Sequence, residues 1–258
     1  MEKLAFVKCE DHEVPMNIVY PDEPKEKYPC MLLVHGFLSC KNGDGFMLKL
    51  ISEALAASGI VAARIDLVSM GENLYSRENY GLQVMLKETR ASFEYLQSLP
   101  EIDENRVGLM GHSLGGRVVF LSSNLPSRLL VSLNGAINVD ENLPMKYSQE
   151  DFDRLGYTIN RTSDGRVELL YPRFFEEMKT TLSRDIYDYR NPVMVCVGTG
   201  DPTLDPNVSY NFINNCNMDN VEHIFIEGAN HTFHAKTRDY TLLNQLIDRL
   251  VPWIADRI

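Results

Sequence analysis

Residues 106–121 read RVGLMGHSLGGRVVFL, and this stretch decides the fold. A predicted strand, Arg106 to Met110, leads into a G-x-S-x-G turn at residues 111–115, and residues 117–123 follow with helical spacing. A sharp strand-to-helix turn holds the Ser113 hydroxyl clear of a sheet, and the flanking glycines let strand and helix approach without a Cβ clash. The start of a helix also supplies free N–H groups and a partial positive charge. We therefore predict that Ser113 is a nucleophile.

Outward from this turn, short β-rich runs alternate with longer helical runs. The predicted strands are 14–20, 30–34, 60–65, 106–110, 129–133, 193–197 and 221–226, and the predicted helices are 46–57, 80–96, 117–123 and 240–253. The run CMLLV at 30–34 is apolar without a break, as expected of a strand that is buried on both faces. The alternation predicts an α/β fold with a mostly parallel, doubly wound sheet. A chain of 258 residues suits a single domain, 1–258.

Residues 139–190 interrupt the alternation, because they contain no clear strand and are rich in charged and aromatic residues. About 50 residues are too many for an ordinary connection in a compact domain. We predict a cap insertion over the active site. Its aromatic rings either pack the cap onto the body or line a pocket for an aromatic acyl group, and the sequence leaves both open. They are Phe152, Tyr157, Tyr171, Phe174, Phe175, Tyr187 and Tyr189.

The charge balance and the cysteines narrow the possible partners. A formal net charge of −11 repels phosphate backbones and anionic membranes, so we expect neither nucleic acid nor a membrane as a partner. The N-terminal residues lack an apolar stretch with a cleavage site, and we expect a cytoplasmic protein. The five cysteines are scattered without a C-x-x-C pair, so neither disulfides nor zinc is predicted. No dinucleotide or phosphate loop is present, and we predict no cofactor.

The end of the predicted strand 30–34 offers an oxyanion hole. There, Val34-His35-Gly36-Phe37 contains a glycine that allows a tight turn, so that the Phe37 backbone N–H can point at a substrate carbonyl. The second donor is the N–H of Leu114, directly after the nucleophile. The alternative is a plain turn at a strand end. We expect His35 itself to make structural hydrogen bonds.

The order of these motifs resembles the α/β-hydrolase superfamily over nearly the whole chain. The motifs are strand–His-Gly-Phe (35–37), strand–Asp66, strand–GHSLGG (111–116), an insertion, strand–GTGD (198–201) and strand–GANH (228–231). Within the superfamily the chain is most similar to small bacterial esterases that include cinnamoyl (feruloyl) esterases, through residues 35–37, the modest insertion and EGANHTF at 227–233. It departs from many relatives at 66–73, where it has DLVSMGEN in place of D-x-x-G-x-G-x-S.

The resemblance implies the chain order serine, acid, histidine, which this sequence supplies as Ser113, Asp201 and His231. A serine hydroxyl needs a neutral imidazole to take its proton, and a carboxylate must orient that imidazole. Asp201 and His231 each follow a predicted strand, where doubly wound sheets build their sites. Asp205 is the alternative acid.

The other histidines are weaker candidates for the base. His12, His223 and His234 lack the placement of His231 after a strand end. His231 and His234 could share a helical face as metal ligands, but no carboxylate or cysteine stands at a supporting spacing, so we predict no metal site.

The implied activity is a serine carboxylic-ester hydrolase that forms an acyl-enzyme on a small or aromatic ester, with hydroxycinnamate esters as one candidate. By the same resemblance, Asp140 and Tyr171 in the insertion are candidate substrate contacts. A thioesterase or a small peptidase-like acyl hydrolase would use the same triad. A non-catalytic binding module on a hydrolase scaffold is a further alternative, which the intact Ser113, Asp201 and His231 disfavour. The expected partner is a small-molecule ester, and a homodimer is left open.

Overall fold

The computed structural model describes residues 1–138, 148–162 and 165–258. Its main sheet has eight strands in the order β1-β2-β4-β3-β5-β6-β9-β10. The strands are β1 Glu2–Cys9, β2 His12–Val19, β3 Tyr28–Val34, β4 Val61–Ile65, β5 Ile102–His112, β6 Leu130–Leu133, β9 Val193–Gly198 and β10 Val221–Ile226. Strand β2 is antiparallel to both of its neighbours, and the pairs from β4 to β10 are parallel. The predicted α/β class with a mostly parallel sheet is confirmed.

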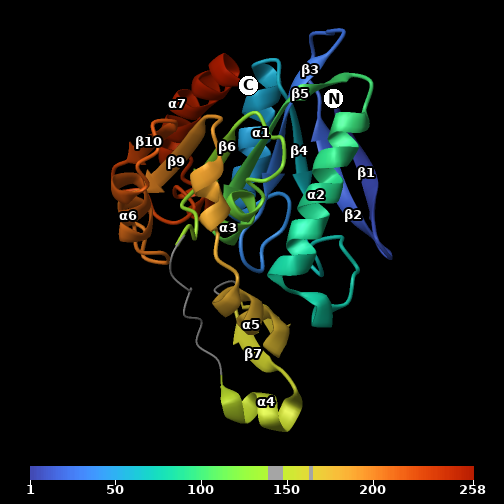
Figure 1. The fold of residues 1–258 in the computed structure, drawn as a ribbon, viewed down its shortest axis with the longest axis vertical. Coiled ribbons are helices and arrows are strands. Elements are labelled where there is room, and N and C mark those ends of the chain that lie inside the picture. Colours follow the sequence, from blue (N-terminus) through green and yellow to red (C-terminus); the bar gives the residue numbers. More distant parts are fainter. Residues whose placement is uncertain (139–147, 163–164) are drawn as a thin grey trace.

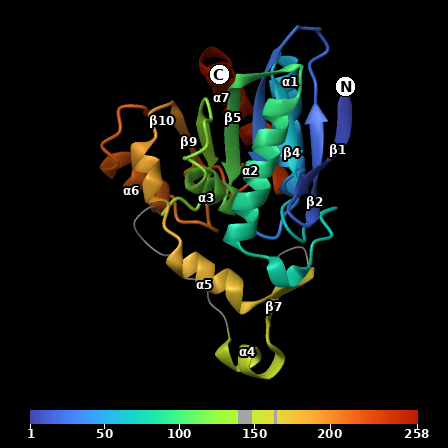
Figure 2. The same cartoon turned by 45° about the vertical axis from the view of Figure 1, so that its right-hand side comes forward.

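Helices cover both faces of this sheet (Figures 1 and 2). One face carries α1 (Met47–Ala57) and α7 (Thr241–Arg257), and the other carries α2 (Leu82–Ser98), α3 (Leu114–Leu121) and α6 (Asn207–Asn215). Successive side chains of a strand point to opposite faces. In β3, Leu32 therefore packs into the core beneath α2 and α3, whereas Met31 and Leu33 pack beneath α1 and α7.

The chain changes direction across the sheet between β3 and β5. From β3 it passes through α1 to β4 on one side and then returns through α2 to β5 on the other side of β3. In open α/β sheets, ligands bind outside the carboxyl ends of the strands at such a switch point. The carboxyl ends of β3 and β5 carry the predicted oxyanion turn and Ser113, respectively.

Strands in two parts of the chain differ from the sequence prediction, and the helices α4 (Gln149–Leu155), α5 (Pro172–Thr180) and α6 were not predicted either. Strand β1 was not predicted, because it is an edge strand whose Leu4 and Phe6 face solvent and break the expected pattern of burial. The expectation that 139–190 lacks a strand was wrong, because β7 (Thr158–Arg161) and β8 (Val167–Leu170) form a separate antiparallel pair. These strands have only four residues each and place Asn160 opposite Glu168, so they show no apolar alternation.

The hairpin β7–β8, with α4 (Gln149–Leu155) and α5 (Pro172–Thr180), lies beyond the carboxyl ends of the parallel strands (Figures 1 and 2). Helix α5 is attached to the body by buried aromatic rings. Phe174 is fully buried, and its ring centroid is 5.3 Å from that of Phe37 and 5.2 Å from that of Tyr80. The ring of Phe174 therefore packs the insertion onto the body.

Arg117 of α3 joins the chain before the insertion and the chain directly after α5 to the nucleophile helix. Its buried guanidinium donates to the carbonyl oxygen of Asn138 (3.1 Å) before the insertion and to that of Thr181 (2.6 Å) after α5. Burial lowers the pKa of Arg117 to about 10, so the side chain is still charged at neutral pH. Two distant segments are thus held by one cation.

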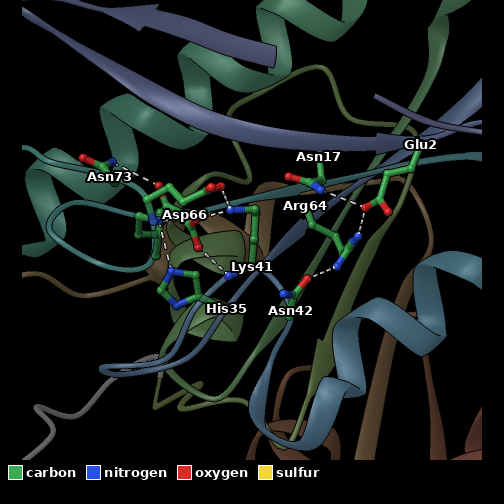
Figure 3. A network of polar contacts seen from close by, with 10 residues as sticks. Glu2, Asn17, His35, Lys41, Asn42, Arg64, Asp66 and Asn73 are labelled. Carbon is green, nitrogen blue, oxygen red and sulfur yellow. Dashed lines mark hydrogen bonds and ion pairs between the residues drawn. The ribbon is translucent and has the colours of Figure 1, made fainter. Parts of the chain in front are cut away.

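Near the edge of the sheet formed by β1, Arg64 of β4 is buried. It pairs with Glu2 of β1 and with Asn42 (Figure 3). This contact ties the unpredicted edge strand to the centre of the sheet. Within the described part of the chain, we find no helix with the length and apolar character needed to cross a membrane.

The packing of α3 against β3 yields a stability prediction. A Cβ at Gly115 would lie 2.3 Å from the Val34 carbonyl oxygen, so we expect Gly115→Ala to lower the free energy of unfolding by about 3 kcal/mol. Gly156→Ala is the control for a glycine without close neighbours: its φ is positive (78°), but a Cβ there would meet nothing within 4 Å. Its cost should be about 1 kcal/mol. Urea denaturation measures both, and equal losses would contradict the close approach.

Candidate active site

Ser113 occupies a strained turn between β5 and α3. Its φ of 55° and ψ of −118° lie in a region that residues other than glycine rarely adopt. Backbone hydrogen bonds hold it there: its N–H donates to Leu133 (3.0 Å), and its carbonyl oxygen accepts from Gly116 (2.9 Å) and Ala136 (3.0 Å). Gly111 allows the turn, because a Cβ at that position would lie 2.1 Å from the Gly115 carbonyl oxygen.

Asp201 and His231 form a hydrogen-bonded pair at the ends of two neighbouring strands. Asp201 follows β9, His231 follows β10, and Asp201 Oδ2 lies 2.6 Å from His231 Nδ1. The other carboxylate oxygen of Asp201 accepts from the backbone N–H groups of Thr203 (2.8 Å) and Leu204 (3.1 Å). Burial alone would raise the pKa of Asp201, but the hydrogen bonds and charge of its partners outweigh burial and lower it. The alternative acid, Asp205, instead accepts from the Asn207 N–H at the start of α6.

Ser113 and His231 line one cavity of about 430 Å³. Its walls include Phe37 and Leu38 after β3, the loop after β9, and the loop from residue 230 to 237. Asp44 and, from the insertion, residues 160–162 and 166 of the β7–β8 hairpin also line it. The structure therefore brings the predicted nucleophile, the predicted base and the insertion together at one site.

The predicted oxyanion turn is held from two sides. The Leu38 N–H donates to the hydroxyl of buried Tyr80 (3.1 Å), and the Leu38 carbonyl oxygen accepts from Arg166 of the insertion (2.8 Å). Phe37, directly before, lines the cavity. Leu114 is the first residue of α3, so its N–H has no partner within the helix. Both proposed donors thus lie beside Ser113.

His35 has the structural role expected of it. Its Nδ1 donates to the Gly36 carbonyl oxygen (2.8 Å), and its Nε2 accepts from the Leu67 N–H (3.0 Å). It thereby joins the oxyanion turn to the loop 66–73, where the sequence departs from its relatives (Figure 3).

The loop 66–73 folds around the carboxylate of Asp66. This buried group accepts from the backbone N–H of Lys41 (2.7 Å) and of Glu72 (3.0 Å) and pairs with the Lys41 ammonium (Figure 3). Gly71 has a φ of 54°, and a Cβ there would lie 2.2 Å from an Asp66 carboxylate oxygen. The unusual sequence therefore forms an ordered wall behind the oxyanion turn.

Two buried polar side chains that we did not predict hold the His231 loop. Asn134, after β6, donates to the carbonyl oxygens of Asn230 (3.2 Å) and His231 (3.0 Å), and its own side-chain oxygen accepts from the Gly198 N–H (2.7 Å). His112 Nε2 also donates to the His231 carbonyl oxygen (2.8 Å). The sequence feature that could have identified Asn134 is its position as a polar residue directly after a buried strand. One amide thus connects the strand ends that carry Asp201 and His231.

The remaining candidates lie elsewhere. Tyr171 contacts Tyr157 (centroids 5.8 Å apart), and it is not among the described residues that line the cavity. Asp140 lies outside the described residues. His12 pairs with buried Glu88 (2.9 Å), and His234 Nδ1 is 4.0 Å from Asp239. His223 stacks on Phe225 (4.4 Å) at the surface.

His112 makes the stability of the site depend on pH. Burial, reinforced by nearby His231, lowers the pKa of His112 from 6.5 to about 4. Between these pH values the unfolded chain binds a proton that the folded chain does not, so the free energy of unfolding falls as the pH drops. Each pKa unit corresponds to about 1.4 kcal/mol, which gives up to about 3 kcal/mol over the window.

His112→Gln keeps a side-chain donor but cannot titrate. We expect its free energy of unfolding to fall less than that of the wild type between pH 6.5 and about 4, as measured by urea denaturation at each pH. Parallel curves for the two proteins would show that His112 is not the group responsible.

Residues 51–256 match the model of the prolyl oligopeptidase family, Peptidase_S9. Among curated proteins, an uncharacterized 31.7 kDa Escherichia coli protein in the traX-finO intergenic region is 22% identical over 163 residues. That match covers 61% of this chain and 56% of the relative, so this chain spans little more than half of the relative's length.

Solved structures with the same fold include Est1E from Butyrivibrio proteoclasticus with bound ferulic acid. It is 20% identical with a TM-score of 0.82, and the match covers 98% of both chains. The esterase domain of a Rhodothermus marinus protein is 16% identical with a TM-score of 0.73, and the match covers 99% of this chain and 98% of that one. The chain therefore belongs to the prolyl oligopeptidase family of serine hydrolases and has the α/β-hydrolase fold.

Proposed function

We propose that this protein hydrolyses carboxylic esters through an acyl-enzyme on Ser113. The observation that carries the proposal is the placement of Ser113, on its strained turn, in the same cavity as His231, whose far ring nitrogen is held by Asp201. A hydroxyl beside a neutral imidazole that a carboxylate orients is the arrangement needed for nucleophilic attack on an acyl carbon.

In the first half-reaction, His231 Nε2 takes the Ser113 hydroxyl proton while Oγ bonds to the ester carbonyl carbon. The carbonyl oxygen becomes an oxyanion, which the N–H groups of Phe37 and Leu114 stabilise. His231 then gives its proton to the leaving alcohol. Because its pKa is lowered, Asp201 stays ionised. Its carboxylate keeps the proton of neutral His231 on Nδ1 and stabilises the imidazolium that forms transiently.

In the second half-reaction, water replaces the alcohol. His231 removes a proton from the water, which attacks the acyl carbon, and the collapse of the second oxyanion returns the proton to Ser113 Oγ. The free acid leaves, and the site is ready for another ester.

We propose a small or aromatic ester as the substrate, with hydroxycinnamate esters as a specific candidate. Support comes from the likeness to Est1E, which was solved with ferulic acid, and from the apolar Phe37, Leu38 and Pro202 in the cavity wall. Residues 1–258 would form one domain with 139–190 as the cap, because the hairpin of the insertion completes the cavity. A substrate contact by Tyr171 stays a prediction.

A small peptidase-like acyl hydrolase is the second candidate. The match to the prolyl oligopeptidase family over residues 51–256 favours it, and the same triad would cleave an amide. A thioester is a third possible acyl donor for this triad. A non-catalytic module is disfavoured, since Asp201 and His231 are hydrogen-bonded and share a site with Ser113.

Hydrolysis of p-nitrophenyl butyrate, methyl ferulate and alanine p-nitroanilide by wild type and Ser113→Ala tests the proposal. We expect both esters to be cleaved and the variant to lose at least about a thousand-fold in kcat/KM, because the nucleophile is absent. Cleavage of the butyrate alone would remove the hydroxycinnamate assignment. Cleavage of the anilide alone would favour the peptidase, and a folded wild type inactive on all three would contradict the proposal.

Asn134 should affect catalysis through the His231 loop. Asn134→Asp is nearly isosteric, but its carboxylate cannot donate to the carbonyls of Asn230 and His231 and would repel them. We expect kcat for p-nitrophenyl butyrate to fall about ten- to a hundred-fold with little change in KM.

Asn17→Asp is a control of the same chemistry, because Asn17 is bonded to Glu2 far from the cavity. If both variants retain full kcat, Asn134 does not position the base.

A further inference from the structure

The balance of cationic and acidic residues around the Ser113 cavity differs from that of the whole chain. The whole sequence carries a formal net charge of −11. Among the described residues that line the cavity, however, Arg161, Arg166 and Lys236 are cationic, and Asp44 is the one carboxylate. Asp44 accepts from Ser39 (2.8 Å) and lies 3.6 Å from the Lys236 ammonium. Among the described lining residues, cationic side chains therefore outnumber carboxylates by three to one, in a protein that is acidic as a whole.

The β7–β8 hairpin fixes where this positive charge lies. Arg161 ends β7, Arg166 directly precedes β8, and both line the cavity from the same side. Arg166 is anchored, because it donates to the Leu38 carbonyl oxygen (2.8 Å) and pairs with Glu168. Glu168 in turn pairs with Arg77 of the body. The hairpin is thus joined to the oxyanion turn and held over Ser113.

Arg161 differs from Arg166 in its contacts. Its side chain is exposed, and within the described chain no ion pair or side-chain hydrogen bond engages its guanidinium. A guanidinium presents a planar fork of N–H donors that matches a carboxylate. A cleft lined by one sign of charge also concentrates ligands of the opposite sign.

We propose that the cavity selects esters that carry a carboxylate, and that Arg161 binds this carboxylate with Arg166 beside it. This inference rests on the proposed ester hydrolysis at Ser113 and adds a substrate class to it. The carboxylate would contact the hairpin while the ester carbonyl lies between Ser113 Oγ and the N–H groups of Phe37 and Leu114. Arg161 is then a specificity residue that takes no part in the proton transfers of His231.

Matched esters separate this inference from the esterase proposal. The p-nitrophenyl half-ester of glutarate and p-nitrophenyl pentanoate have the same acyl chain length, but only the first has a carboxylate. Butyrylglycolate and ethyl butyrate place the same difference on the alcohol side. For at least one pair, we expect the wild-type kcat/KM to be about ten-fold higher for the anionic ester, mainly because its KM is lower. About 0.5 M NaCl should reduce this preference, because salt screens the attraction between charges.

Substitution of Arg161 identifies the group responsible. Arg161→Gln should reduce the preference about three- to ten-fold, and Arg161→Lys should retain part of it, because the charge remains but the fork is lost. Arg154→Gln is the matched control: Arg154 is also an exposed arginine of the insertion, pairs with Asp151 and does not line the cavity. We expect it to leave the preference unchanged.

The outcomes are distinct. The absence of a preference for the anionic ester in both pairs, or equal effects of Arg161→Gln and Arg154→Gln, overturns the inference while ester hydrolysis stands. If the folded wild type cleaves none of the four esters, the esterase proposal itself fails, and the inference fails with it.

Discussion

The close approach of α3 to β3 is the constraint on which the site depends. The first turn of α3 lies so near the end of β3 that Gly115 has no room for a Cβ beside the Val34 carbonyl oxygen. The chain must therefore turn sharply between β5 and α3, and Ser113 takes a positive φ at that turn. The same approach places the start of α3 next to the turn after β3, so the two proposed oxyanion donors lie on neighbouring segments.

Buried polar groups then transfer this rigidity to the other strand ends. The amide of Asn134 bonds to the last residue of β9 and to the loop after β10, and His112 adds a second bond to the His231 carbonyl. Such bonds are strong in a buried environment, and leaving one of their partners unpaired is costly. Orientation of the imidazole is consequently set by the backbone that carries it as well as by Asp201.

Most of the sheet could be predicted because buried strands have an unbroken apolar sequence. The strand predicted at 221–226 has those same bounds in the structure. The strands predicted at 30–34 and 193–197 are observed at Tyr28–Val34 and Val193–Gly198. The edge strand β1 and the hairpin β7–β8 could not be predicted in this way, because their residues are partly exposed and show no clear alternation of apolar and polar side chains. The role of Asn134 escaped prediction for another reason: it depends on a hydrogen bond to a residue 97 positions away.

The attachment of the insertion to Arg117 has a consequence for how such a protein can diversify. The chain before the insertion and the chain directly after α5 both bond to one guanidinium on α3, at Asn138 and Thr181. These two positions are natural junctions for recombination, because a foreign segment that preserves two carbonyl groups there would keep the anchor. New substrate ranges could then be acquired by exchanging the intervening 40 or so residues, while the sheet and the reacting groups are inherited unchanged.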